Sequence, residues 1–351
     1  MLNSSVKKHL HDGAVIPAHP LALTEGRQLD EAGQRALTRY YIDAGVGGIA
    51  VGVHTTQFEI RDPQFNLFEK VLTLAVEEIE RAKLPNSFIK VAGISGPTVQ
   101  AIQEARFIKH IGYDLGLLSM GGLNDDTEAQ LLERTAEIAG IIPVFGFYLQ
   151  PVVGGRVLSY DFWRQLADIP NVYGIKVAPF NRYQSLDVIR AVCHSNRNED
   201  IAIYTGNDDN IIADLLTTYR INVNGHKVEK QIVGGLLGHW SVWTKTAVDI
   251  FNEIKKAQSE QDMPKTLLTL GQEITDANAA FFDSRNQFKG SIAGINEVLA
   301  RQGLLKGHWC LRDEEQLSPN QMTEIDRIYK DYPHLNDDAF VEAHLDKWFA
   351  R

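Results

Sequence analysis

Short apolar runs alternate with segments of helical periodicity along the first two thirds of the chain. Runs of four to eight apolar residues are typical of buried strands, whereas apolar residues spaced three and four apart indicate one face of a helix. The predicted strands are residues 14–18, 48–53, 88–94, 115–119, 142–148, 172–177, 201–204 and 231–236. The predicted helices between them are residues 30–44, 64–82, 98–111, 128–139, 160–167 and 185–192.

This alternation predicts the fold class. Successive strands begin roughly 30 residues apart, which is the repeat of one strand followed by one helix. About eight such repeats predict an α/β fold, a (β/α)8 TIM barrel. A doubly wound parallel sheet is the alternative. It would place a glycine-rich phosphate turn after an early strand, and the chain contains no G-x-G-x-x-G sequence.

The strand pattern ends near residue 240. Helices are predicted over residues 244–258, 264–282, 292–302 and 318–331, the last opened by Ser318 and Pro319. We therefore expect a barrel over residues 1–240 and a C-terminal helical region, residues 241–351, packed on it. The polar, turn-rich residues 220–230 predict an extra loop before the last strand.

Composition narrows the functional class. Of the 351 residues, 44% are hydrophobic and 23% charged, and the net charge is −10. This acidic balance disfavours nucleic acid and anionic membranes as partners. The two cysteines make a disulfide framework unexpected, and the polar N-terminal residues do not resemble a signal peptide. We expect a cytoplasmic enzyme with a small-molecule substrate.

Two chemically useful side chains fall at the ends of neighbouring predicted strands. Lys176 ends the strand before Pro179, and Tyr148 ends the preceding strand. Burial favours the neutral amine of a lysine, which is a nucleophile, and a nearby phenol can move protons. Because barrel enzymes react at the C-terminal strand ends, we expect these two side chains to act together. Lys90 lies near the start of its strand, so a structural role is predicted for it.

Around these residues the sequence resembles the dihydrodipicolinate synthase / N-acetylneuraminate lyase family of class I aldolases. Gly174-Ile-Lys is similar to the family's G-I-K segment, which carries the Schiff-base lysine. Tyr148 with Pro151 is similar to its Y-N-x-P segment, whose tyrosine is the proton shuttle. Gly206-Asn-Asp resembles the turn after its seventh strand. The resemblance runs from about residue 13 to residue 327. It implies a (β/α)8 barrel with a helical C-terminal part, a 2-oxo acid substrate such as pyruvate, and a homo-oligomer, either a tetramer or a dimer.

The resemblance also assigns residues to substrate binding, and here the chain departs from the family. The family's carboxylate turn, G-[ST]-[ST]-G-E, is replaced by Gly52-Val-His-Thr-Thr. A second tyrosine of the synthase branch is missing from residues 119–123, and Arg156 follows the shuttle tyrosine a few residues late. We therefore expect a reaction other than true dihydrodipicolinate synthesis. The expected substrate-binding residues are Gly52, His54, Thr55, Gly206, Asn207 and Asp208.

Three hypotheses follow. The leading one is a Schiff-base lyase or aldolase that acts on a 2-oxo acid and needs neither a cofactor nor a resident metal. The second is a metal-dependent barrel enzyme in which His19 and His54, with Asp208 or His239, supply the ligands. The third is a non-catalytic barrel that binds a 2-oxo acid or a sugar acid.

Overall fold

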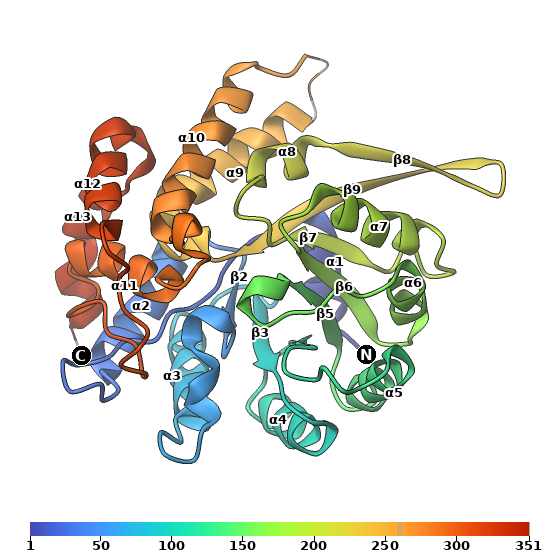
Figure 1. Ribbon diagram of the computed structural model, residues 1–351, viewed down its shortest axis with the longest axis horizontal. Helices are drawn as coiled ribbons and strands as arrows, with labels where there is room; N and C mark the ends of the chain where they lie inside the picture. The colour runs from blue at the N-terminus through green and yellow to red at the C-terminus, as the bar shows by residue number, and fades with distance from the viewer. Residues whose placement is uncertain (259, 261, 351) are drawn as a thin grey trace. The chain divides into compact units, whose positions relative to one another are not determined.

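Strands and helices alternate from residue 15 to residue 237 of the computed structural model, which describes residues 1–258, 260 and 262–350 (Figure 1). The described chain forms two units. The first comprises Met1–Ala14, Asn86–Asn207 and Ala213–Leu236. The second comprises Val15–Pro85, Asp208–Ile212 and Leu237–Arg351.

A parallel sheet forms the centre of the first unit. Its strands are β3 (Ile89–Ile94), β4 (Leu115–Leu118), β5 (Val144–Leu149), β6 (Val172–Ala178), β7 (Ala202–Thr205) and β9 (His226–Leu237). They pair side by side in the order β3-β4-β5-β6-β7-β9. Strands β4 to β7 are buried along their whole length, as expected of parallel strands covered on both faces.

Helices connect these strands, and several begin where the sequence supplies caps. The connecting helices are α4 (Thr98–His110), α5 (Glu128–Ala139), α6 (Tyr160–Asp168), α7 (Arg182–Cys193) and α8 (Ile211–Leu216), and α1 (Ser4–Asp12) precedes the first strand of the chain. Thr127 and Gln130 form a capping box at α5. Ser159 caps α6, and the Asn181 side chain accepts hydrogen bonds from two backbone N–H groups at the start of α7. These caps fix where each helix begins after its strand. The sequence did not predict α1 or α8.

Residues 220–230 form part of a β-hairpin, so the prediction of an extra loop there was wrong. Strand β8 (Thr218–Val223) pairs antiparallel with the first half of β9, and the two form a long ribbon (Figure 1). The turn is Asn224-Gly225, and both residues have positive φ. Asn-Gly is the strongest short hairpin signal. In β8, intermediate and exposed positions alternate and no residue is buried. Polar residues therefore occupy much of the strand, and the alternation of apolar and polar residues that predicts a strand is weak.

The second unit begins with β1 (Val15–Pro17), α2 (Glu31–Ala44), β2 (Gly48–Val51) and α3 (Phe68–Arg81). Two short 3₁₀ helices, η1 (His54–Thr56) and η2 (Phe58–Arg61), follow β2. Beyond the ends of β1 and β2, Ala18 and Ala50 form a parallel bridge, and the His19 N–H donates to the Ala50 carbonyl at 2.8 Å. This pairing holds the turn after β2 beside the end of β1.

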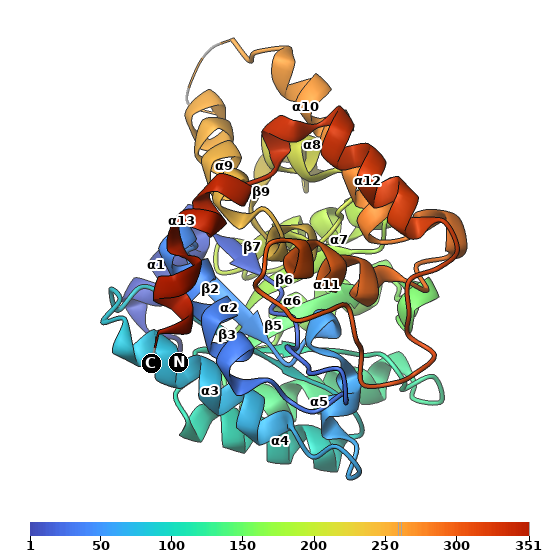
Figure 2. The same ribbon diagram turned by 90° about the vertical axis from the view of Figure 1, so that its left-hand side faces the viewer.

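The C-terminal helices complete the second unit (Figure 2). They are α9 (Thr244–Gln258), α10 (Thr266–Phe281), α11 (Ser291–Arg301), α12 (Gln321–Asp331) and α13 (Asp338–Phe349). The first four were predicted within three residues at each end, and α13 was missed. Tyr40 of α2 donates to Asp337 and accepts from the Thr244 N–H, both at 2.7 Å, so one buried hydroxyl joins α2 to the starts of α9 and α13. The predicted division at residue 240 stays a prediction. None of the described helices is long and apolar enough to cross a membrane.

Candidate active site

Lys176 lies near the C-terminal end of β6 and is 8% exposed. Strand β6 is buried at every position and ends at Ala178, before Pro179. Lys176 pairs with Phe147 of β5 on one side and with Tyr204 of β7 on the other. The strand therefore holds a lysine between two aromatic neighbours, with little access to bulk water.

Two neighbours define the surroundings of the Lys176 side chain. Its Nζ lies 4.4 Å from the centroid of the Phe147 ring, which is cation–π distance. A Cβ placed on Gly206 would lie 2.5 Å from Lys176 Cε and 2.7 Å from Ala178 Cβ. Only glycine gives the lysine chain its room, so Gly206 shapes the site by lacking a side chain.

Tyr148 lies one position out of register with Lys176. Val144 pairs with Val172, 28 positions ahead, whereas Phe145 and Phe147 pair with residues 29 positions ahead, because the register shifts between Val144 and Phe145. A shift of one residue turns every later side chain to the other face of the sheet. The interval of 28 residues between Tyr148 and Lys176 therefore does not make them partners.

Tyr148 instead pairs with Val177 and packs against α6, where its ring centroid lies 4.9 Å from that of Trp163. It is 1% exposed, and among the described residues its hydroxyl has no hydrogen-bond partner. Burial raises the pKa of Tyr148 above its usual value. The structure thus brings Phe147, which sequence reasoning missed, to the lysine. Strand alternation is the signal that could have found it, but only with the register known.

Asn207 links the ends of β6 and β7. Its Oδ1 accepts from the Phe180 N–H at 3.0 Å, and its Nδ2 donates to Asp214 at 2.9 Å and to Ser185 at 3.3 Å. Thr205 also donates to Asp214, at 2.7 Å. Phe180 has φ of 53°, a backbone conformation that a bulky residue adopts only when its surroundings hold it there. Asn207 therefore secures the turn that follows Lys176.

In the second unit, hydroxyls of the turn at residues 52–56 bind the end of β1. Thr55 donates to the Ala18 carbonyl at 2.7 Å, and Thr56 donates to the His19 carbonyl at 2.6 Å. Thr56 Oγ1 also accepts from the Gly52 and Val53 N–H groups, at 2.9 and 3.2 Å. Gly52 has φ of 73°, which favours glycine. Thr56 thus occupies two backbone donors that an anion could otherwise use. His54 is half-buried beside Phe58.

The residues of the metal hypothesis are held by other contacts. Both ring nitrogens of the buried His19 have hydrogen-bond partners, the Pro20 carbonyl at 2.8 Å and the Thr38 hydroxyl at 2.9 Å. Burial lowers the pKa of His19 to about 4. The Asp208 carboxylate accepts from the His239 N–H at 2.8 Å. Within residues 1–258, 260 and 262–350, no group of three or more His, Cys, Asp or Glu side chains could hold a metal ion.

The fold is similar to that of solved N-acetylneuraminate lyase and dihydrodipicolinate synthase structures. N-acetylneuraminate lyase from Fusobacterium nucleatum, complexed with pyruvate, superimposes with a TM-score of 0.71 at 18% identity, covering 93% of this chain and 99% of that one. A prophage protein of the dihydrodipicolinic acid synthase family from E. coli, in complex with pyruvate, gives 0.73 at 17% identity, with 91% and 98% covered. The likeness shows a (β/α)8 TIM barrel with a C-terminal helical region.

Sequence relatives are consistent with this fold. A 4-hydroxy-tetrahydrodipicolinate synthase from Methanospirillum hungatei is 29% identical over 207 residues, 58% of this chain and 67% of the relative. One from Nitratidesulfovibrio vulgaris is 26% identical over 261 residues, 74% and 80% of the two chains. The match spans 64% of another, from Herminiimonas arsenicoxydans, so the chain spans about two thirds of the length of the first of these relatives. No family model matches the sequence.

The chain is thus similar in sequence to 4-hydroxy-tetrahydrodipicolinate synthases, and it shares the fold of dihydrodipicolinate synthase and N-acetylneuraminate lyase. Its identity to each of the relatives above is below 30%. Arg156 of this chain donates to the carbonyls of Leu123 and Asp126, both at 2.8 Å. The guanidinium thus ties the chain after β5 to the turn after β4.

Lys90, the other lysine predicted to lie in a strand, is near the start of its strand as the sequence predicted. Lys90 is the second residue of β3, and its backbone N–H donates to the Asp114 carboxylate at 2.9 Å. It is half-buried and at the opposite strand end from the position that Lys176 has in β6. Lys90 therefore offers an internal control for any test of Lys176.

Proposed function

We propose that this protein is a Schiff-base-forming lyase or aldolase that acts on a 2-oxo acid similar to pyruvate. The observation that carries the proposal is the placement of Lys176. Its Nζ lies near the end of a buried strand, over the Phe147 ring, in a space that exists because residue 206 is glycine. Burial takes hydration from this lysine, and the loss of hydration favours the neutral, nucleophilic amine.

The reaction would run through a covalent intermediate on Lys176. The amine attacks the ketone carbon, the former carbonyl oxygen takes one proton from the attacking nitrogen and a second from a general acid and leaves as water, and a C=N iminium remains. A base then removes the hydroxyl proton of the fragment that leaves as an aldehyde, and the iminium accepts the electron pair of the carbon–carbon bond that breaks, giving an enamine. Protonation and hydrolysis of the enamine return the amine and a 2-oxo acid. Synthesis would be the reverse.

Tyr148 is proposed as the proton relay because of the family resemblance at Tyr148 and Pro151. Tyr148 pairs with Val177 rather than with Lys176, and neighbouring residues of a strand point to opposite faces of the sheet. The Tyr148 hydroxyl would therefore exchange protons with Lys176 either past the end of β5 or through a water molecule. A Tyr148→Phe variant tests this role: loss of a general acid–base costs about 10²- to 10⁴-fold in kcat. A residual activity above about one third would instead make Tyr148 a packing residue.

The altered turn after β2 bears on the substrate carboxylate. We propose that Gly52, His54 and Thr55 bind it, because they stand where the family that the sequence resembles has its carboxylate turn. The Gly52 N–H donates to Thr56 and the Thr55 hydroxyl to the Ala18 carbonyl, so these two groups would exchange those partners for the substrate. Asn207 and Asp208 would act mainly by holding the backbone at Phe180 and at His239.

The same departures support a substrate pair different from that of the synthases. Arg156 holds two backbone carbonyls, so its guanidinium is committed to the loop rather than to a second carboxylate. Residues 119–123 supply no tyrosine. We propose carbon–carbon cleavage or formation with an aldehyde other than the synthase substrate.

Borohydride trapping tests the proposal. Purified protein is incubated with borohydride and each member of a panel of 2-oxo acids, beginning with pyruvate, and the adduct is located by peptide mass analysis. The expected result is one reduced adduct on Lys176, lost in Lys176→Ala.

Lys90→Ala is the matched control, because it also removes a strand lysine. It should keep the adduct. Equal trapping in wild type and Lys176→Ala would reject the lysine. Reversible binding of a 2-oxo acid without any adduct would favour the non-catalytic barrel.

A further inference from the structure

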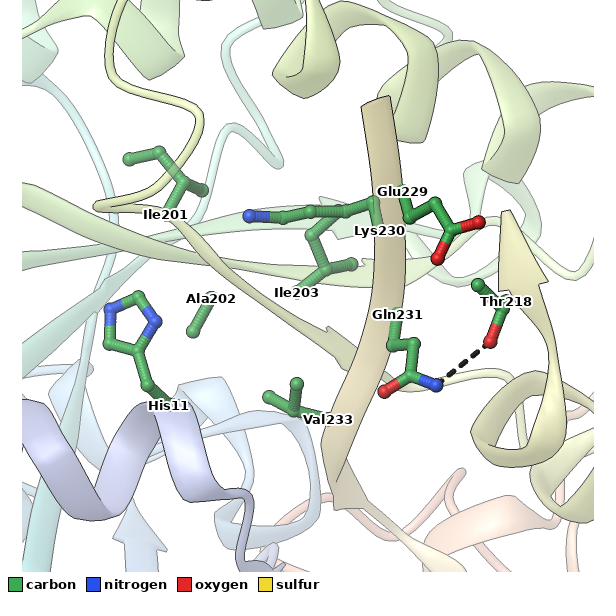
Figure 3. Close-up of a pocket in the computed structure, with 9 residues that line it drawn as sticks. All are labelled: His11, Ile201, Ala202, Ile203, Thr218, Glu229, Lys230, Gln231 and Val233. Atoms are coloured by element: carbon green, nitrogen blue, oxygen red, sulfur yellow. Dashed lines mark hydrogen bonds between the residues drawn. The ribbon is translucent and has the colours of Figure 1, made fainter. Parts of the chain in front are cut away.

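A cavity lies in the first unit, at the N-terminal start of β7 (Figure 3). Its volume is about 350 Å³. Ala202, Ile203 and Val233 form an apolar floor, and His11, Lys230 and Gln231 supply polar groups. We call this set the basal cavity. Ligand pockets range from ~300 to ~1,000 Å³, so its size suits a small molecule.

An irregularity in the sheet creates this space. Ile203 pairs with Ile232 while Tyr204 pairs with Gly234, which leaves Val233 as an extra residue in β9. Gly13, at the end of α1, lies against Val233, because a Cβ on Gly13 would lie 1.8 Å from the Val233 carbonyl oxygen. The end of α1 therefore lies close to the bulge in β9, beside the basal cavity.

Two nitrogen groups face the hollow from opposite sides. Figure 3 shows His11 on α1 and Lys230 on β9, with Ala202 between the His11 ring and the Lys230 nitrogen. Among the described residues, the buried His11 Nε2 has no hydrogen-bond partner. The Lys230 ammonium donates to the Asn198 carbonyl, a neutral acceptor. Gln231 donates to Thr218 at 2.8 Å at the rim.

The nearest carboxylates have cationic partners of their own. Glu229 pairs with Arg220 at 3.0 Å and with Lys227 at 3.2 Å. Asp200 pairs with Lys7 at 2.6 Å. Burial and the Lys230 and Lys7 ammonium groups lower the pKa of His11, against an opposing effect of Asp200, and burial lowers the pKa of Lys230, against opposing effects of Cys193, Glu199 and Asp200. An anion placed between His11 and Lys230 would relieve this unfavourable electrostatic environment.

We propose that the basal cavity binds a small organic monocarboxylate with a short branched apolar chain. The carboxylate would accept a charge-assisted hydrogen bond from Lys230 and a second one from His11, and the chain would cover Ile203 and Val233. A carboxylate without an apolar chain would leave Ile203 and Val233 exposed to water. An uncharged ligand would lack the charge-assisted hydrogen bond from Lys230.

This site is separate from Lys176. The layer of side chains at Lys176 includes Tyr204, which is fully buried and packs at 5.3 Å against Phe145. The Tyr204 hydroxyl donates to the Leu10 carbonyl of α1 at 2.9 Å. Aromatic rings therefore fill the interior beside β7, and the basal cavity opens at the start of the strand rather than at its reactive end.

Calorimetric titration with 3-methylbutanoate at pH 7.5 tests the proposal, with 3-methylbutanamide as the uncharged analogue. The full chain carries Lys176→Ala, so that binding at the reactive lysine does not contribute. The expected result is millimolar binding of the carboxylate and none of the amide. Lys230→Gln should weaken binding at least tenfold, which is about 1.4 kcal/mol.

Lys227→Gln is the matched control, because it removes one positive charge from the same hairpin at a residue that does not line the cavity, while its partner Glu229 keeps Arg220. It should leave the affinity unchanged. His11→Phe provides a second variant if Lys230→Gln fails to fold, as judged by circular dichroism, and it should also weaken binding. The proposal is overturned if the Lys176→Ala chain, with its cavity unchanged, does not bind 3-methylbutanoate. It is also overturned if Lys227→Gln weakens binding as much as Lys230→Gln does.

Discussion

At the scale of single residues, the neighbour that lies over Lys176 is a phenylalanine. The face of an aromatic ring attracts cations, and the neutral amine of Lys176 gains a positive charge when it becomes an iminium. Phe147 is therefore placed to favour the iminium over the neutral amine at the point where the proposed intermediate forms. It could not be assigned from the sequence, because Phe145 and Phe147 are alike until the register is known.

Phe147→Leu should reduce the amount of iminium that forms. Removing the ring face costs about 1 kcal/mol, or about fivefold in the equilibrium constant. The measurement is the fraction of Lys176 trapped by borohydride at subsaturating 2-oxo acid. Phe147→Tyr retains the ring face and should trap as wild type does. Identical trapping in Phe147→Leu would show that the ring only fills space.

Gly206→Ala should disable Lys176 without touching its chemistry. The new Cβ would contact Lys176 Cε and Ala178 Cβ at 2.5 and 2.7 Å, so the lysine must move. A displacement of ~1 Å at a reacting group can cost ~10²-fold in rate. Steady-state kinetics measures the loss, and Gly271→Ala is the control, because its Cβ would meet nothing closer than 3.4 Å. Unchanged kcat in Gly206→Ala would remove Gly206 from the site.

At the scale of elements, the pairing of β5 with β6 decides which side chains share a face. Spacing along the chain gave the correct strands and helices, because hydrophobic periodicity is a local property. It did not reveal the one-residue shift after Val144, which depends on contacts between strands. The hairpin of β8 and β9 was missed for a related reason, since a ribbon with two exposed faces has little apolar alternation.

Asn207 joins these elements, and Asn207→Ala should loosen them. The substitution removes the acceptor of the Phe180 N–H and a buried donor to Asp214. Leaving buried polar groups unpaired costs about 1–3 kcal/mol. Urea unfolding should show that loss, whereas Asn196→Ala, at an exposed position, should show little. Equal unfolding free energies for the two variants would contradict the role assigned to Asn207.

At the scale of the whole molecule, stability should depend on the charge of Glu315. Burial raises the pKa of Glu315 from 4.5 to about 7, and among the described residues its Oε2 has no hydrogen-bond partner. Between these two pH values the folded protein binds more protons than the unfolded chain. The contribution of Glu315 to stability is therefore present below pH 4.5 and is lost as the pH rises through about 7.

Glu315→Gln should then stabilise the protein at pH 8 by on the order of 1 kcal/mol, after allowance for solvent screening, and change little at pH 4.5. Thermal unfolding at both pH values measures the effect. The exposed Glu314→Gln variant should not show this pH dependence. A constant difference between Glu315→Gln and wild type across the pH range would disprove the assignment.

The assembly of this chain into a homo-oligomer, either a tetramer or a dimer, stays a prediction. Light scattering on the purified chain would give its mass in solution. A mass of 39.3 kDa would mean a monomer, and an integral multiple of it an oligomer.

By itself the sequence determined the order of strands and helices, the barrel class and the lysine near the end of β6. Each of these depends on residues close together in the chain. Tertiary structure decided that Phe147 rather than Tyr148 pairs with Lys176, and that Thr56 takes the Gly52 and Val53 donors. Strand register and hydrogen-bond partners are set by segments far apart in the chain. A single bulge can reverse which face a side chain occupies without leaving a mark in local periodicity.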